Sequence, residues 1–463
     1  MMKRRDFVKT LGATGVALYA SDLVGDLIAQ SPKARVMESR FKGLSDLALS
    51  EARRLGCTYA DIRFTRNVND SVAVRDRIVT DSFGFGAGGM ETSAGFGVRV
   101  IHSGVWGFAS SPFVTEGDIK KITAQATEVA KASAVSKRFE VKLAPVPAYQ
   151  DYWSVPVKQK PEDVSLDDKI AFLMKINEAA LKVPGVIRVQ SNMAFDYEWK
   201  YLATSEGSYI EQEIWRTSPG FTVTALKDGK AKSRTFSVAP KSAGYEVVLN
   251  AKMLENVERI ANEAVEHCTA PPAGVGLKDL IMTPAHAMLT IHEIVAHPTE
   301  LDRVVGYEAN YAGTSFVKAS DVGKLMMGSK LFNVTCDRTL EGGMCTVGYD
   351  DDGVKSQRWP IIQEGRLVDL QTNRETAHYI GQTASKGCTF ATSWRNYPFL
   401  RMPNVHVEPG PPGSPTPEEI IADTKDGILI DGRGSYSIDQ QRFNGQFGGD
   451  AFWEVKNGKK TRM

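Results

Sequence analysis

Residues 291–298 read IHEIVAHP, which places His292, Glu293 and His297 in the pattern H-E-x-x-x-H. The common zinc-protease pattern has one residue fewer, and its two histidines lie at i and i+4 on one face of a helix. On an ideal α-helix, side chains five residues apart diverge by about 140°, so a straight helix cannot bring both imidazoles to one ion. A metal site here therefore requires a local change in the helix.

The flanking residues predict a helix that begins near Thr283 and ends at His297. Thr283 suits a helix N-cap, and Pro284 suits the first helical position. Pro298 disfavours the α conformation in the residue before it. Two changes would bring the histidines together: a π-bulge that widens the turn, or unwinding of the helix at His297. The proline favours unwinding.

The chemistry of these side chains points to a metal-dependent hydrolase. His292 and His297 are good ligands for Zn²⁺, and a catalytic zinc site keeps one position for water. Glu293 can accept the proton of that water as a general base. Two histidines are not a complete ligand set, so a third protein ligand must come from elsewhere. The remaining candidates lack partner spacing and are interpreted as ordinary histidines: His267, His286 and His378.

Composition excludes several classes of protein. Of 463 residues, 42% are hydrophobic and 24% are charged, as in a globular protein, and the net charge of +1 gives no electrostatic case for nucleic acid or an acidic membrane. The five cysteines contain no C-x-x-C pair, which argues against a disulfide framework or a cysteine-only zinc site.

The N-terminus is typical of an export signal. It reads MMKRRDFVKTLGATGVALYA, in which R-R-x-F-x-K precedes a weakly apolar stretch, as in a twin-arginine (Tat) signal. We assign residues 1–35 to this segment and expect a periplasmic or other extracytoplasmic location. No clear A-x-A cleavage site follows, and no other stretch is long and apolar enough for a membrane span.

Hydrophobic periodicity predicts an α+β fold, in which an N-terminal α/β region precedes a β-rich C-terminal domain that carries the metal-site helix. The predicted domains are residues 36–135 (α/β), 136–240 (α+β, opening with a linker over 136–156) and 241–463 (the metalloprotease domain). Helices are expected at 38–55, after the caps Thr115 and Ser165, and near 250–267. Strands are expected at 59–68, 71–79, on both sides of the turn at 103–104, and over 186–226.

Two further motifs fail in their context. Gly84-x-Gly86-x-x-Gly89 has the letters of a dinucleotide fingerprint, but a strand rather than a helix follows it. Asp350-Asp351-Asp352-Gly353 lacks the alternate spacing and the distal glutamate of a calcium loop, so it is interpreted as a hairpin turn.

Longer stretches resemble the TldD/PmbA family of metalloproteases. The matching segments are HEIVAHPTELD at 292–302, GTSFVKASDVG at 313–323, YDDDG at 349–353, EGRLV at 364–368, RNYPFLRMPN at 395–404 and the terminal FNGQFGGDAFWEVKNGKKTR, with GFGVRVIHSGVWGFASS near the N-terminus. Because they cover residues 60–463 in order, the resemblance is far more specific than the six-residue motif.

This resemblance implies a zinc peptidase that acts on unfolded or flexible peptides, often as a homodimer or as a heterodimer with a family member. The histidine motif places the chain with the cutting branch of the family, and Glu300 and Asp302 match acidic positions that are expected to support the site. The family's third metal ligand is a cysteine in a C-terminal tail beyond the point matched by Met463, so we expect the sequence to be a fragment. Cys388 is the one thiol considered as a substitute, against a structural role.

Two other functions stay open on the sequence alone. A non-catalytic subunit or peptide-binding module could share the fold, because two histidines without a third ligand bind metal weakly. A metal-binding envelope protein without peptidase activity would bind metal stoichiometrically but would show no affinity for extended peptides.

Overall fold

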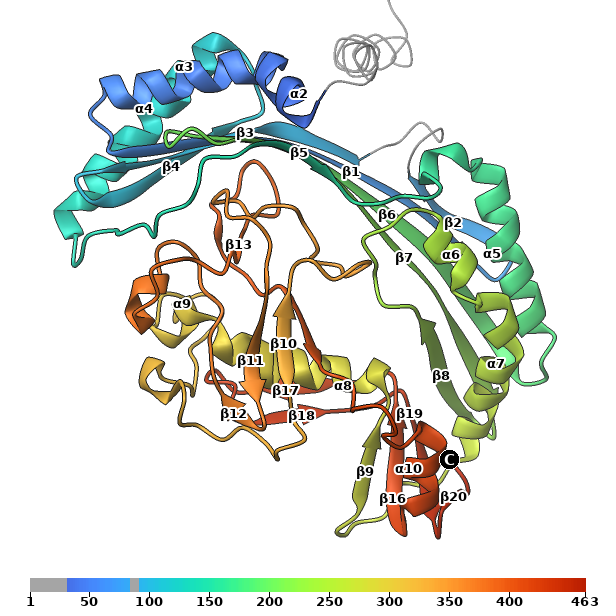
Figure 1. Cartoon of the computed structure of the whole chain (residues 1–463). Helices are drawn as coiled ribbons and strands as arrows, with labels where there is room; N and C mark the ends of the chain where they lie inside the picture. Colours follow the sequence, from blue (N-terminus) through green and yellow to red (C-terminus); the bar gives the residue numbers. More distant parts are fainter. Residues whose placement is uncertain (1–30, 84–90) are drawn as a thin grey trace, which may run out of the picture.

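The computed structural model describes residues 31–83 and 91–463 (Figure 1). The predicted Tat segment lies almost entirely outside these residues. Gly84, Gly86 and Gly89 of the dinucleotide-like motif also lie outside them. Among the helices of the described chain, none is long and apolar enough to cross a membrane. The fold is α+β, as the sequence predicts, and the histidine motif lies on a helix of the C-terminal part.

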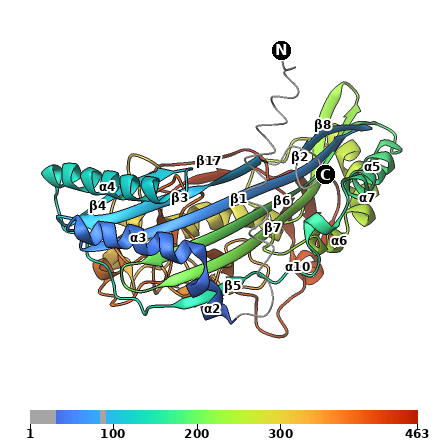
Figure 2. The same ribbon diagram turned by 90° about the horizontal axis from the view of Figure 1, so that it is seen from above.

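One eight-stranded sheet organises the molecule. Its strand order is β4-β3-β1-β6-β7-β5, with β2 added to β1 and β8 added to β7. Figure 2 shows the long strands running side by side beneath the helices. The strand bounds are β1 Tyr59–Arg75, β2 Ile78–Phe83, β3 Glu91–His102, β4 Val105–Ser111, β5 Gln150–Ser154, β6 Val186–Thr204, β7 Tyr209–Lys227 and β8 Lys230–Ser237.

The prediction for the first two strands was partly wrong. A strand does begin at Tyr59, but β1 continues through 71–75, and the turn comes only at Asp76, which has a φ of 55°. Val72 and Val74 point into the same buried cluster, so the alternation continues without a break. The strand expected over 71–79 is therefore divided between two strands. Residues 71–75 belong to β1, and β2 begins at Ile78, which pairs with Arg75.

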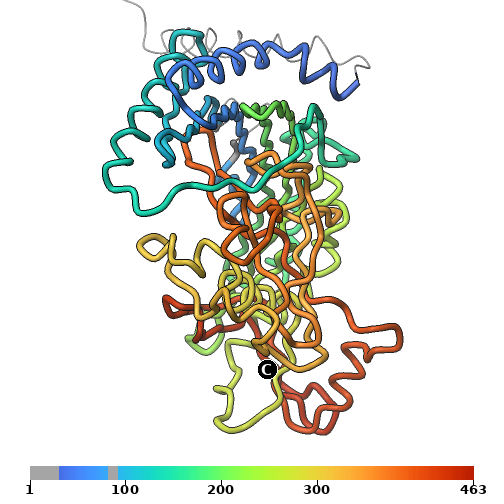
Figure 3. Tube along the Cα trace, turned by 60° about the vertical axis from the view of Figure 1, so that its left-hand side comes forward, coloured from blue at the N-terminus to red at the C-terminus, as the bar shows by residue number. Residues whose placement is uncertain are grey.

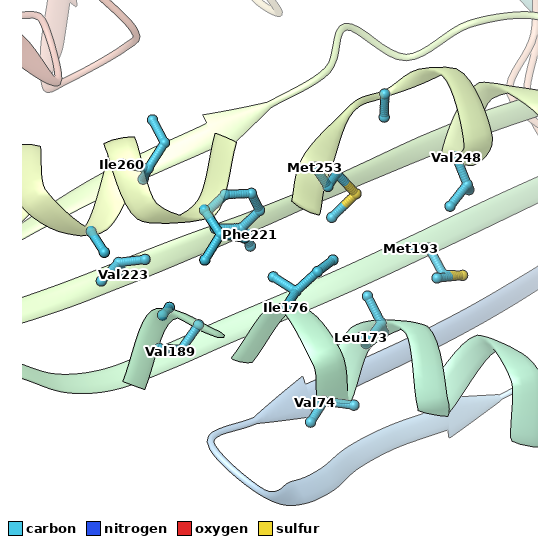
Figure 4. Packing of buried hydrophobic residues seen from close by; sticks show 14 of the residues in the cluster. Val74, Leu173, Ile176, Val189, Met193, Phe221, Val223, Val248, Met253 and Ile260 are labelled. Atoms are coloured by element: carbon cyan, nitrogen blue, oxygen red, sulfur yellow. The ribbon is translucent and has the colours of Figure 1, made fainter. Parts of the chain in front are cut away.

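Helices cover the outer face of the sheet in two groups, each over its own core. The first group packs on β1, β3, β4 and β5, and the second packs on β1, β6, β7 and β8 (Figure 1). Figure 4 shows the second core, in which Leu173 and Ile176 meet Val189, Phe221 and Val223. The bounds of these helices are α2 Pro32–Glu38, α3 Arg40–Arg54, α4 Glu116–Ser133, α5 Leu166–Leu181, α6 Glu246–Asn250 and α7 Met253–Thr269. The predicted caps are present, since Thr115 and Ser165 accept from the backbone N–H of residues 118 and 168.

The C-terminal part lies under the inner face of the arched sheet, and Figure 3 shows it as the yellow-to-red half of the trace. It contains two four-stranded sheets, β12-β11-β10-β15 and β20-β19-β16-β9, and the pairs β13-β14 and β17-β18. The bounds are β9 Asp279–Met282, α8 Pro284–Ile291, α9 Leu301–Val304, β10 Val334–Asp337, β11 Arg358–Gln363, β12 Arg366–Leu367, β13 Thr389–Phe390, β14 Phe399–Leu400, β15 Asn404–Val407, α10 Pro417–Asp423, β16 Asp426–Asp431, β17 Tyr436–Ile438, β18 Gly445–Phe447, β19 Ala451–Lys456 and β20 Lys459–Lys460.

Buried charges join this part to the sheet. On β1, the even-numbered Ile62 and Phe64 face the helices, whereas Arg63 is turned to the C-terminal part. Arg63, Arg99 on β3 and Lys200 on β6 meet the aspartates of the turn at 350–353. Lys200 Nζ lies 3.1 Å from Asp351 Oδ1, and Arg99 Nη2 lies 2.8 Å from Asp352 Oδ1.

The Asp350–Gly353 segment is a turn, as the sequence predicts, because Gly353 N–H donates to Asp350 O at 3.1 Å. Its aspartates are nevertheless buried, with at most 5% of each residue exposed. The buried lysine and arginines, together with backbone N–H groups, satisfy these carboxylates, and this compensation is what permits charges in an interior.

The domain boundaries at 135 and 240 stay predictions. The structure adds that strands from both sides of residue 135 share the large sheet, since β1 pairs with β6 from Asp61↔Thr204 to Arg75↔Gln190. Within the expected linker, β5 adds to the sheet in parallel with β7.

Candidate metal centre

A π-helical turn places the two histidines of the motif together. Residues His292–Ala296 form this turn directly after α8, and His297 N–H donates to His292 O across five residues. His297 itself is helical, with φ −61° and ψ −42°. The expectation that the chain unwinds at His297 was therefore wrong, and the π-bulge is the change that occurs. A π-turn holds one residue more than an α-turn, so side chains five apart share a face.

Pro298 does not end the helical path where the sequence predicts. A 3₁₀ turn continues over His297–Thr299, and the chain becomes extended only at Glu300, with ψ 117°. Thr283 is the N-cap of α8 and Pro284 is its first residue, but the Thr283 hydroxyl donates to Asp431 at 2.6 Å instead of capping the helix.

The geometry of the motif suits a shared ion. The imidazole rings lie 4.6 Å apart between centroids and are inclined at 80°. One ligand atom from each of His292, Glu293 and His297 lies within 4.8 Å of the others. His292 Nε2 is 3.9 Å from Glu293 Oε1. The motif residues are therefore neighbours in space as well as in sequence.

A buried carboxylate orients His297. Its Nδ1 lies 2.6 Å from Glu300 Oε2, and Arg303 Nη2 donates to the same oxygen at 3.0 Å. Burial alone would raise the pKa of Glu300, but the His297 hydrogen bond and Arg303 outweigh it and hold this pKa below its usual range. An ionised Glu300 accepts a hydrogen bond from Nδ1–H, which leaves the Nε2 lone pair for a metal.

The other histidine is held in the neutral form that binds metal. Burial, followed by the neighbouring His297, lowers the pKa of His292 to about 4. Its side chain remains 43% exposed, so its ring forms the open side of the site. A neutral imidazole is the form in which histidine ligates.

Glu293 faces the same space with an unused oxygen. Its Oε2 is buried and has no hydrogen-bond partner among the described residues. An orphaned carboxylate oxygen beside two imidazoles fits a site that holds a divalent ion and a water molecule. The described residues therefore fit zinc as far as two nitrogen ligands and one base.

Of the two predicted supporting residues, the structure brings Glu300 to the site and leaves Asp302 beside it. Asp302 Oδ1 accepts from the Arg303 N–H at 2.7 Å, and no contact joins it to the described atoms of the motif histidines. Burial, then the charges of Glu300 and Glu308, raise the pKa of Asp302 well above its usual value.

Cys388 lies elsewhere, in the core of the C-terminal part, and is fully buried. Burial raises the pKa of its thiol to about 12. It is not in the group formed by His292, Glu293 and His297. The third ligand thus remains a prediction.

The other histidines lie apart from the motif. His286 Nδ1 contacts Gly432 O at 3.0 Å, and the His378 ring packs on Tyr379 with centroids 4.2 Å apart. Burial lowers the pKa of His267, which lines a separate pocket near α7.

Sequence reasoning missed two arginines at the site. Arg303 is fully buried and links Glu300 to Glu308. Arg442 lies between β17 and β18, with its Nε 3.9 Å from Glu293 Oε2. Arg303 follows the motif closely and could have been suspected, whereas nothing in the sequence brings residue 442 to residue 293.

Comparison with known proteins agrees with this geometry. The PmbA/TldA metallopeptidase models match in three parts: domain 1 at residues 60–130, the central domain at 159–267 and the C-terminal domain at 276–463. The last of these contains the whole motif.

Curated relatives carry names of the same kind. A metalloprotease of Methanocaldococcus jannaschii is 28% identical over 88% of this chain and 85% of its own length. A zinc metalloprotease TldD homolog of Saccharolobus solfataricus is 24% identical over 78% of this chain and 75% of its own. The crystal structure of TldE from Thermococcus kodakarensis shares the fold, with a TM-score of 0.69 at 16% identity over 90% and 88% of the two chains. Together the three domain models and these relatives establish that the chain belongs to the TldD/PmbA family of metallopeptidases.

Proposed function

We propose that this chain is a zinc-dependent peptidase of the H-E-x-x-x-H type that cuts unfolded or flexible peptides. The observation that carries the proposal is the π-turn, which gathers two imidazoles and a carboxylate within 4.8 Å. A zinc ion held there would polarise the substrate carbonyl and acidify a water molecule.

The residues of the chain have separate roles in this proposal. His292 and His297 would hold the ion, and Glu300 fixes the ring of His297. Glu293 accepts the proton of the attacking water and returns it to the leaving amine. Arg442 Nε lies 3.9 Å from Glu293 Oε2, so a positive charge faces the oxygen of this base.

The test compares hydrolysis of an unstructured peptide by the zinc-loaded wild type and by Glu293→Gln, with the exposed Glu258→Gln on α7 as a matched control. We expect loss of turnover in Glu293→Gln and after chelation, and normal turnover in the control. Equal rates for wild type and Glu293→Gln would remove Glu293 from the mechanism, and activity that survives chelation would remove the metal.

The alternative is a non-catalytic subunit or peptide-binding module. It is favoured by the ligand set, because the described residues supply only two histidines and one glutamate. Peptide binding without turnover, in the presence of zinc and of a family partner, would support it. Association with a second copy or another family member is likewise proposed, and analytical ultracentrifugation of the protein alone and mixed with that member tests it.

Export by the Tat pathway is proposed on the motif R-R-x-F-x-K alone. A fusion of residues 1–35 to a folded reporter should leave the cytoplasm, and Arg4→Lys/Arg5→Lys should retain it. Export of the double variant at the normal rate would contradict this assignment.

A further inference from the structure

A cavity of about 670 Å³ lies between the sheet and the C-terminal part, and its lining includes Asp302 and Glu308 but none of the three motif residues. Its walls come from the inner side of β3 and β4, from Leu143 in the segment before β5, from the residues around α9, and from the loops that flank β13 and β14. Six of its lining residues are Trp106, Asp302, Tyr307, Glu308, Glu375 and Tyr397, and we call the space that they line the acidic cavity.

Three short contacts link the wall of the acidic cavity to the proposed metal ligand His297. Glu300 Oε2 is 2.6 Å from His297 Nδ1, and Arg303 Nη2 lies 3.0 Å from that oxygen and 2.8 Å from Glu308 Oε2 in the cavity wall. A peptide that spans the metal centre could therefore place a neighbouring residue in this cavity.

The wall carries more negative than positive charge. Its carboxylates are Asp302, Glu308, Asp352 and Glu375, and its cations are Arg99 and Arg401. Arg99 is already matched, because its Nη2 lies 2.7 Å from Asp61 and 2.8 Å from Asp352. The carboxylates of Asp302, Glu308 and Glu375 remain against Arg401 and the buried Arg303.

Glu308 is paired through only one of its oxygens. Only 5% of the residue is exposed, its Oε2 lies 2.8 Å from Arg303 Nη2, and its Oε1 has no hydrogen-bond partner among the described residues. Glu375 is aimed by one donor, Trp106 Nε1, at 2.9 Å. Burial raises the pKa values of both carboxyl groups. A cation brought into the cavity would stabilise their charged forms.

Aromatic rings complete the wall. Trp106 and Tyr397 meet edge to face with centroids 6.1 Å apart, and the Arg99 guanidinium already lies 4.9 Å from the Trp106 ring. Tyr307 stacks on Phe139 of the segment before β5 at 5.6 Å. Ring faces attract a desolvated cation, and their bodies bury the methylene groups that carry it.

We propose that the acidic cavity binds a primary ammonium group of the peptide substrate, either its α-amino group or a lysine side chain. Asp302, Glu308 and Glu375 supply the charge, and Trp106, Tyr307 and Tyr397 supply the rings. This inference rests on the proposed peptidase function, since it assigns a specificity subsite to the same site.

The experiment measures binding rather than turnover. The zinc-loaded Glu293→Gln chain is titrated with fluorescent peptides of one flexible sequence: a free amino terminus, an N-acetylated form, and N-acetylated forms with one internal lysine or its neutral isostere norleucine. Charge-assisted contacts of this kind contribute about 1.5–3 kcal/mol. We expect ammonium-bearing peptides to bind about tenfold more tightly than their neutral matches.

Cavity variants make the test specific. Asp302→Asn and Glu375→Gln, each added to Glu293→Gln, should lower this preference to about two- to threefold, whereas Glu258→Gln should leave it unchanged. The glutamine at 375 retains an acceptor for Trp106, and a thermal melt checks that each variant is folded. A preference for the free amino terminus alone, or for lysine alone, identifies the source of the ammonium.

Equal binding of charged and neutral peptides would overturn the inference, as would a preference that survives Asp302→Asn/Glu375→Gln in folded protein. A preference set by the peptide's terminal carboxylate, lost on C-terminal amidation, would assign the cavity to Arg401 instead. Hydrolysis of the same peptides by wild type is scored separately. Cutting without ammonium preference refutes only the subsite, and ammonium preference without cutting refutes only the peptidase.

Discussion

Replacing Glu300 by glutamine should weaken metal binding without changing the volume of the side chain. In the wild type, Glu300 Oε2 accepts from His297 Nδ1 at 2.6 Å and from Arg303 at 3.0 and 3.2 Å, while Oε1 accepts from the Met402 N–H at 3.1 Å. An amide keeps the shape of the side chain but removes its negative charge and turns one acceptor into a donor.

Two magnitudes follow from these contacts. Loss of the partner that orients a ligating histidine costs about 10- to 100-fold in metal affinity, or about 1.4–2.7 kcal/mol. Breaking a buried ion pair costs about 3–5 kcal/mol of folding stability. The lower end of that range applies here, because Glu308 still lies 2.8 Å from the stranded Arg303 guanidinium.

The two effects can be measured separately. Zinc affinity is obtained by competition against a chromogenic chelator with folded protein, and unfolding free energy is obtained from urea titration with excess chelator present. The control is Glu258→Gln, which should match wild type in both assays. Zinc affinity within twofold of wild type in a folded Glu300→Gln chain would refute the claim that Glu300 orients His297.

The other predictions concern the stability of the folded protein. Asp351→Asn removes the charge that faces Lys200 at 3.1 Å, so urea titration should show a loss of about 3 kcal/mol, and a loss below about 1 kcal/mol would contradict the buried ion pair. Burial would raise the pKa of Glu246, but hydrogen bonds from four backbone N–H groups outweigh it and lower this pKa. The stabilisation from the ionised carboxylate is therefore present above about pH 4.5 and is lost as pH falls through the folded pKa. Glu246→Gln should flatten this acid limb of the stability profile. Gly107→Ala on β4 places a Cβ 2.0 Å from Ala126 O on α4 and should cost about 1–3 kcal/mol in melts. Gly117→Ala on α4 makes only an ordinary contact with Thr115 Oγ1 at 3.9 Å and should not destabilise.

Local signals predicted much of the secondary structure. The caps at Thr115 and Ser165 and the turn at 103–104 lie where the sequence places them. Each depends on a few adjacent residues with defined conformational preferences. The α+β class followed from the same local patterns.

The prediction failed at the motif and also where distant contacts decide the structure. Pro298 argued for unwinding at His297, yet that residue stays helical and the irregularity is the π-turn that precedes it. In the sequence, the aspartates at 350–352 look like an exposed turn. The partners that compensate their charge in the interior lie on β1, β3 and β6, more than 150 residues earlier, so no local pattern reveals them. Arg442 reaches Glu293 in the same way, through the path of the chain rather than through any spacing.

The buried ion pairs between the large sheet and the turn at 350–353 make assembly of the site depend on the strand register of that sheet. Arg63, Arg99 and Lys200 belong to three strands, yet all three must point inward at the same level to meet one tight turn. A slip of one residue in any strand would send its cation to the opposite face. The C-terminal part, which carries the histidines, can therefore pack fully only against a correctly paired sheet. We expect the candidate metal centre to form only after these long-range contacts are in place.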